Sequence, residues 1–360
     1  MQTLLRHYTF SLIFTAACLA GAAWYGWITE GTITGMLSIL WIVFVLSILE
    51  ISLSFDNAVV NATVLRDMDP VWQRRFLTIG ILIAVFGMRI VFPIAIVSIA
   101  AQIGPWEAIQ LSLGDPEEYK RIVSSAHVGI AGFGGAFLAM VGLNFFFDDE
   151  KDVHWIRSVE RTVGKFSNIR AVEIGIVILI LYIVSTLLDD AEALTFLTAG
   201  ILGLVTFIAV HAIGQIIEEG EAKKKAAGEV VRSGLGGFLY LEVLDASFSF
   251  DGVIGAFALS NNMIVIAIGL SVGAMFVRSM TIHLVKAGTL SEFRYLEHGA
   301  FWAIIVLGMI MLFSAKYHIP ETFTGLIGAI LIGLSLWWSV RHNRREAKAA
   351  RAETAQDASR

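Results

Sequence analysis

Long apolar stretches alternate with short polar connections along almost the whole chain of 360 residues. A helix needs ~20 apolar residues to cross the hydrocarbon core of a membrane, and most of these stretches approach or exceed that length. The pattern predicts an all-α polytopic membrane protein with about ten transmembrane helices. We expect these helices at about 9–29, 34–65, 75–101, 125–147, 171–188, 193–217, 233–260, 263–285, 298–315 and 321–340.

Lys and Arg gather in every second connection between the apolar stretches. Cytoplasmic loops of membrane proteins collect these residues, so the alternation predicts that both the N and the C terminus are cytoplasmic. The tail at 341–360 is basic and is predicted to be a disordered cytoplasmic segment. The segments rich in Lys and Arg are the N-terminal segment with Arg6, then 66–75, 148–170, 218–232, 286–294 and 341–360.

Composition agrees with a membrane protein: 56% of the residues are hydrophobic, 16% are charged, and the net charge is −5. The acidic balance argues against a nucleic-acid partner. The single cysteine, Cys18, excludes an intramolecular disulfide or a thiolate metal cage. The first apolar stretch also resembles a signal peptide, with small residues at 20–22, but it continues through Trp24 and Trp27, which favours a membrane span.

An acidic motif occurs twice. Leu49–Asn57 and Leu244–Gly252 both contain an acid, then five residues, then an aspartate that ends the triplet Ser-Phe-Asp. An Ile-Gly pair follows each motif and precedes Arg89 or Arg278 by the same spacing. The alternative is that two apolar segments resemble each other by chance. The shared Ser-Phe-Asp, Ile-Gly and Arg spacings argue against chance.

The two motif helices are separated by five predicted spans, an odd number, so the two halves should run in opposite directions. The expected domains are a first membrane repeat at 1–170, whose fifth helix continues to 190, and a second repeat at 191–340. Inverted five-helix repeats of this kind commonly build transporters whose site lies at the midplane on discontinuous helices. We therefore expect a break near Ser-Phe-Asp in each motif helix, eased in the second by Gly252.

Several ionisable residues lie deep in the apolar stretches, where a charge costs several kcal/mol and needs a partner or a function. Carboxylates surrounded by hydroxyl and amide oxygens form a hard site that suits Mg, Ca or Mn. The candidate metal ligands are Glu50, Asp56, Asp245 and Asp251, and the supporting residues are Ser54, Asn57, Ser249, Arg89 and Arg278. The alternative is that Glu50, Arg89, Asp245 and Arg278 form structural ion pairs between the halves.

Three segments of the chain, Glu50–Asn57, Asp245–Asp251 and Leu296–Ala300, resemble the TerC family of integral membrane proteins, in its longer branch. The resemblance implies a location in the bacterial inner membrane, a role in exporting manganese or another divalent cation, and metal binding by the four acids of the two motifs. Gly252 departs from the family pattern, in which a serine often follows the second aspartate.

These observations predict a secondary transporter, not an enzyme, that exports a divalent cation by alternating access. Mn²⁺ is the expected substrate, with Ca²⁺ and Mg²⁺ as alternatives, and no cofactor is expected. Coupling to protons is expected because the sequence has no P-loop. A non-transporting scaffold for exported proteins and an intramembrane aspartyl hydrolase are the competing functions. The expected partners are the lipid bilayer and the metal ion, and a homo-oligomer is left open.

Overall fold

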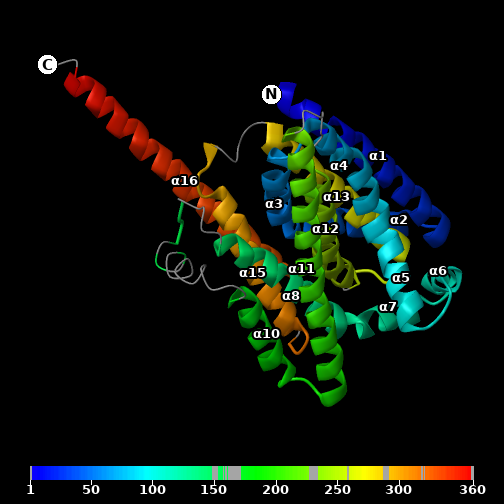
Figure 1. Ribbon diagram of the computed structural model, residues 1–360. Helices are drawn as coiled ribbons and strands as arrows, with labels where there is room; N and C mark the ends of the chain where they lie inside the picture. Colours follow the sequence, from blue (N-terminus) through cyan, green and yellow to red (C-terminus); the bar gives the residue numbers. More distant parts are fainter. Residues whose placement is uncertain are drawn as a thin grey trace.

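The protein is all-α (Figure 1). A computed structural model describes residues 2–147, 153–156, 158, 160, 172–226, 234–257, 259–286, 292–317, 319 and 321–357. Within this part of the chain, seven helical segments are long and apolar enough to cross a membrane, so the chain is a multi-pass membrane protein. They are Tyr8–Glu30, Ile33–Leu53, Pro70–Ile99, His127–Phe146, Asp190–Lys223, Met263–Lys286 and Leu296–Ser314.

The helices of the first half begin at the N-terminus and include one π-helical stretch, η1, between α4 and α5. Their bounds are α1 Gln2–Glu30, α2 Ile33–Leu53, α3 Phe55–Arg66, α4 Pro70–Leu82, η1 Ile83–Val91, α5 Phe92–Ala100, α6 Pro105–Gly114, α7 Pro116–Ser125 and α8 His127–Phe146.

The second half begins with a short apolar helix, α10, and ends with a long helix that carries the basic tail. The bounds are α10 Val172–Ser185, α11 Asp190–Ala226, α12 Leu235–Ala256, α13 Met263–Lys286, α15 Leu296–Ser314 and α16 Glu321–Asp357.

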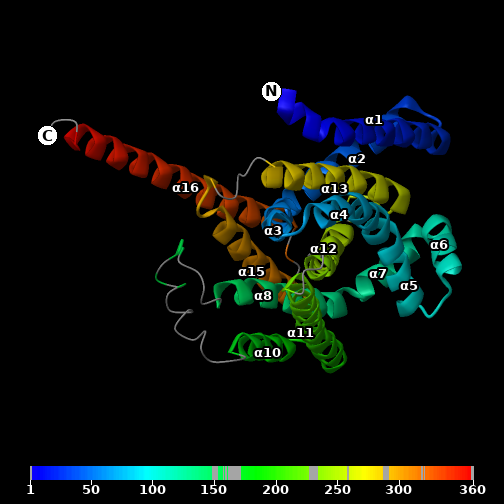
Figure 2. The same cartoon turned by 45° about the horizontal axis from the view of Figure 1, so that its top comes forward.

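The helices pack in successive layers, which Figure 2 shows from α1 at one side to α10 at the other. Helix α1 packs on α2 and α13, and α13 packs on α3 and η1. The central layer contains α3, α4 and α12, and beyond it α15 and α8 pack against each other, with α11 and α10 outside them. Helices α3 and α12 are therefore covered by other helices, while α2 has an inner face on α13 and an outer face that is exposed.

The outer helices expose large apolar side chains, as expected for a surface in contact with lipid. Trp24 on α1, Trp41 on α2 and Leu194 on α11 are each exposed over more than half of their surface, while Val43 and Leu46 on the inner face of α2 are fully buried. The apolar outer surface agrees with the membrane location that the sequence predicts.

Two sequence-based predictions fail at the periphery. The tail after residue 340 was predicted to be disordered, but α16 continues as a helix to Asp357 and projects from the bundle (Figure 1). Its residues are largely Ala, Arg, Lys and Glu, which are strong helix formers. The acidic connection after α5, expected as a loop, forms α6 and α7, each of which starts with a proline in its first turn.

Candidate cation site

The first motif helix breaks at Ser54, as the sequence predicts. Helix α2 ends at Leu53 and α3 starts at Phe55, and Ser54 between them has a non-helical backbone with φ −104° and ψ 15°. The Ser54 amide still donates to the carbonyl oxygen of Glu50 at 3.0 Å, and its hydroxyl donates to the Glu50 carboxylate, also at 3.0 Å. The break therefore places a hydroxyl group directly beside a buried acid.

Glu50 forms a buried ion pair with Arg89. The two residues are 2% and 4% exposed, and the Arg89 guanidinium also donates to the hydroxyl of Ser249 on α12. Arg89 belongs to η1, whose nine residues are π-helical. Wide helical turns of this type occur frequently at functional sites. The structure therefore brings together Glu50, Arg89 and Ser249, three of the candidate site residues.

Two glycines leave space for the Glu50 side chain. A Cβ atom on Gly252 of α12 would lie 3.1 Å from Glu50 Oε2, and one on Gly273 of α13 would overlap the Glu50 stem. The expectation that Gly252 breaks the second motif helix is wrong, because α12 is continuous from Leu235 to Ala256. Gly252 instead allows α12 to approach the carboxylate of the first motif.

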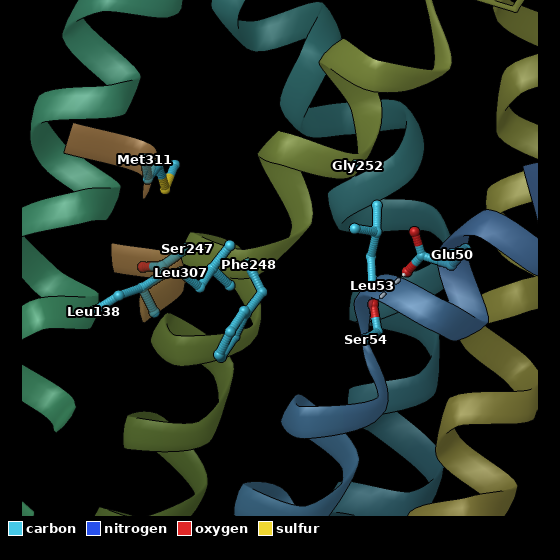
Figure 3. Close-up of a pocket in the computed structure, with 9 residues that line it drawn as sticks. All are labelled: Glu50, Leu53, Ser54, Leu138, Ser247, Phe248, Gly252, Leu307 and Met311. Carbon is cyan, nitrogen blue, oxygen red and sulfur yellow. Dashed lines mark hydrogen bonds between the residues drawn. The ribbon is translucent and has the colours of Figure 1, made fainter. Parts of the chain in front are cut away.

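A small cavity opens beside Glu50 and Ser54 (Figure 3). Its volume of about 10 Å³ is near the minimum that holds one water molecule. Glu50 and Ser54 lie on one side in Figure 3, and residues of α8, α12 and α15 lie on the other. The lining residues are Glu50, Leu53, Ser54, Leu138, Ser247, Phe248, Gly252, Leu307 and Met311.

Asp245 forms a second, partly buried acidic group with the buried Asn57. The Asn57 side-chain amide donates to Asp245 Oδ1 at 2.6 Å. The guanidinium of Arg278 interacts electrostatically with both Asp245 and Glu242, and it lies 3.8 Å from the centre of the Phe76 ring and donates to the Phe76 carbonyl oxygen. Arg278 therefore compensates the acids of this group, as Arg89 does for Glu50.

Glu242 is a site residue that the sequence analysis missed. It lies one helical turn before Asp245 on α12, and a Cβ atom on Gly80 of α4 would lie only 2.6 Å from its Oε1 atom. The first motif has Ser47 at the equivalent position, and the Ser47 hydroxyl donates to the carbonyl oxygen of Gly269 at 3.0 Å. An acid inside an apolar stretch was the available signal, but Glu242 precedes the segment that repeats.

The two remaining candidate acids are placed differently. Asp56 is 4% exposed, and its Oδ1 atom accepts a hydrogen bond from the backbone N–H of Asn57 at 3.0 Å. Its Oδ2 atom faces α16, where a Cβ atom added to Gly328 would lie 3.8 Å away. Asp56 does not line the cavity beside Glu50. Asp251 belongs to α12, but its side chain lies outside the described residues. Among the residues whose side chains are described, no three His, Cys, Asp or Glu side chains gather closely enough to hold a metal.

A further buried acid, Glu160, lies outside the motifs. Its carboxylate accepts the amides of Trp155 and Ile156, each at 2.9 Å, and the indole N–H of Trp302 at 3.1 Å. His298 Nε2 lies 3.8 Å from the same carboxylate and 2.8 Å from the Val153 carbonyl oxygen. These bonds attach a short segment to the start of α15, and the contacts of His298 belong to this attachment.

Comparison with known proteins gives one match, to a family described as "Protein of unknown function (DUF475)", over residues 55–346. The matched region includes Asp56, Arg89 and the whole second motif but starts after Glu50. No characterised protein and no solved structure matches the chain. The resemblance to TerC proteins stays a prediction.

Proposed function

We propose that this chain, which belongs to the DUF475 family of proteins of unknown function, is a secondary transporter that exports a divalent cation. Mn²⁺ is the proposed substrate, with Ca²⁺ and Mg²⁺ as alternatives, and protons are the proposed coupling ion. The export direction and the location in the bacterial inner membrane rest on the resemblance to TerC proteins.

The observation that supports this function best is the cavity at the break between α2 and α3. Glu50, Ser54 and Ser247 are its polar lining residues, beside Gly252 and five apolar residues. The side chains of these three polar residues carry oxygen atoms, which hard divalent cations prefer. Discontinuous helices in transporters bind ions in the same manner, with unwound backbone and side-chain oxygens at the break. A buried carboxylate at such a break is costly unless it has a function.

Arg89 provides the charge balance in the proposed mechanism. In the described conformation its guanidinium neutralises Glu50. A divalent cation in the cavity would compete with Arg89 for the Glu50 carboxylate. Protonation of Glu50 would remove its negative charge and so release both the cation and the Arg89 guanidinium. We therefore propose that Arg89, a proton and the metal ion compete for the Glu50 carboxylate. This competition would couple proton movement to metal transport.

Asp56, Asp245 and Asp251 complete the proposed set of metal ligands. Asp245 and Glu242 are compensated by Arg278 in the described conformation, while Asp56 faces Gly328 on α16. We assign the three aspartates to other stages of the transport cycle, in which α3 and α12 move relative to the helices that cover them.

The proposed topology is ten spans in two inverted repeats with both termini in the cytoplasm. The seven long apolar segments become ten when α10, α12 and α16 are added. The contacts between the motifs support the repeat: the residue after the second acid of each motif faces the first acid of the other, Asn57 facing Asp245 and Gly252 facing Glu50.

The test is transport by the purified protein in liposomes, with Mn²⁺, Ca²⁺ and Mg²⁺ flux measured separately. We expect wild type to move Mn²⁺, and Glu50→Gln and Asp56→Asn to lose at least nine-tenths of the rate. The matched control is Asp67→Asn, which changes an exposed carboxylate at the end of α3 and should leave the rate unchanged. A correctly inserted wild type that moves none of the three cations would contradict the proposal and favour a scaffold.

A further inference from the structure

A second and larger cleft lies between α3, α8, α11 and α12. Its volume is about 240 Å³, and its lining includes Val64, Asn144, His211, Gln215, Gly237 and Tyr240. Four of these side chains are polar, and no Asp, Glu, Lys or Arg is among the lining residues. The cleft is separate from the cavity beside Glu50, with which it shares no lining residue.

The cleft opens at the end of the bundle where α3 and α8 finish and α12 begins. The connections at this end, 66–75, 148–170 and 218–232, are the basic ones, so the charge pattern assigns this end to the cytoplasm. His211 and Gln215 are exposed on α11, and their Nε2 atoms lie 3.3 Å apart. Water and ions from the cytoplasm would thus meet polar groups at this opening.

One face of α3 leads from the cleft to Asp245. Val64 lines the cleft and packs against α12, because a Cβ atom on Gly237 would lie 3.3 Å from its Cγ1. Asn61 and Asn57 follow on the same face, three and seven positions deeper, and Asn57 contacts Asp245. The path from cleft to acid along this face is ~10 Å, since a helix rises 1.5 Å per residue.

Two amide oxygens on this face lack partners. Asn57 and Asn61 are 3% and 2% exposed, and within the described part of the chain neither Oδ1 atom accepts a hydrogen bond. A buried acceptor without a donor is unfavourable. Amide oxygens are also ordinary ligands of Ca²⁺ and similar hard cations. The two oxygens lie between a polar cleft and a pair of acids, Glu242 and Asp245, whose charge attracts cations.

We propose that this cleft is the cytoplasmic access route for the transported cation, and that the Asn61 amide oxygen is an intermediate ligand between the cleft and the Asn57–Asp245 pair. The inference rests on the proposed transport function and adds a route and a residue to it. Asn61 would bind the partly dehydrated cation after it passes Val64 and before it reaches Asp245.

Cysteine accessibility tests the route. Cys18 is the single native cysteine, so Cys18→Ala gives a background in which Gln215→Cys places one thiol in the cleft. Thr206→Cys is the matched control, half-buried on the same helix and outside the cleft lining. We expect a membrane-impermeant thiol reagent to modify Gln215→Cys from the side of the basic connections at least tenfold faster than Thr206→Cys, and Mn²⁺ to slow that reaction.

The outcomes separate the route from the proposed function. Equal reaction at both positions, or no protection by Mn²⁺, would overturn the access route even if wild type transports Mn²⁺. Protection without flux in wild type would support the cleft as a cation route and contradict only the transport proposal. Modified Gln215→Cys that transports at the full rate would also overturn the route.

A substitution series tests Asn61. Asn61→Leu removes the amide oxygen with little change in volume and should raise the KM for Mn²⁺ about tenfold, while Asn61→Asp, which keeps an oxygen ligand, should not. Thr63→Val is the control on the same buried helix, because the Thr63 hydroxyl bonds only to the Val59 carbonyl of its own helix in the described contacts. An unchanged KM in Asn61→Leu, with normal folding, would overturn the role of Asn61.

Discussion

Asn57 on α3 donates its side-chain amide to Asp245 on α12 at 2.6 Å, and this bond between residues 188 positions apart joins the two acidic motifs. At the equivalent place in the other motif, Gly252 lies against Glu50. Asparagine therefore fills the space beside one acid, while glycine leaves space beside the other. This difference agrees with the position of the cavity beside Glu50 and Ser54.

Substitution of Gly252 by Asn should close the cavity. The new side chain would approach the Glu50 carboxylate, as Asn57 approaches Asp245, and would fill the space proposed for the cation. We expect Gly252→Asn to insert and fold but to lose Mn²⁺ transport, measured as flux in liposomes. The control is Gly175→Asn on α10, where a Cβ atom would meet nothing within 4 Å. Retained transport in Gly252→Asn would mean that the cavity is not used.

Asn57→Leu should destabilise the protein. The substitution removes the side-chain donor to the partly buried Asp245 carboxylate, and a buried polar group left without its partner costs ~1–3 kcal/mol. We expect a lower midpoint in thermal unfolding of the detergent-purified protein, compared with wild type and with Thr63→Val. An Asn57→Leu variant as stable as Thr63→Val would show that Asp245 does not depend on this bond.

Arg89→Leu should be less stable than the double variant Arg89→Leu with Glu50→Gln. The single change leaves the buried Glu50 carboxylate without its counter-charge, and breaking a buried pair costs ~3–5 kcal/mol. The double change removes both charges. Thermal unfolding of the two variants and of Glu50→Gln provides the comparison, and neither variant should transport Mn²⁺. Equal stability of the single and double variants would contradict a compensating role for Arg89.

Glu160→Gln should weaken the attachment of the segment at 153–160 to α15. The carboxylate accepts three N–H groups, and an amide at this position would direct its own N–H groups toward one of these donors, at a cost of ~1–3 kcal/mol. We expect faster cleavage of this segment in limited proteolysis. Glu346→Gln is the control, since Glu346 is exposed on α16 and pairs only with His342 among the described ion pairs. Identical cleavage of Glu160→Gln and Glu346→Gln would refute the attachment.

Much of the framework could be predicted from the sequence because membrane helices have a strong and simple signal. The lengths of the apolar stretches identified the multi-pass fold. The alternative of structural ion pairs included Glu50 and Arg89, which do pair, although within the first half and not between the halves. The break at Ser54 also followed from the motif. Each of these features depends on local composition or on a constraint that the bilayer imposes.

The remaining details depend on contacts between segments distant in the chain. Gly252 could either break α12 or leave space for the Glu50 side chain. The outcome depends on how closely α2 approaches α12, and the spacing of residues along the chain does not determine that distance. Glu242 was missed because its partner, Arg278, is recognised only when α12 and α13 are packed. The helix at the end of α16 was missed because its basic charge suggested a solvated tail, although its residues favour helix.

The central claim is that the Glu50 carboxylate and the neighbouring oxygens bind a divalent cation. Equilibrium binding of Mn²⁺ to the detergent-purified protein, followed by the loss of the electron paramagnetic resonance signal of the free ion, tests it most directly. We expect one saturable site per wild-type chain, at least tenfold weaker binding in Glu50→Gln, and unchanged binding in Asp67→Asn. Equal Mn²⁺ binding by wild type and Glu50→Gln would contradict the account.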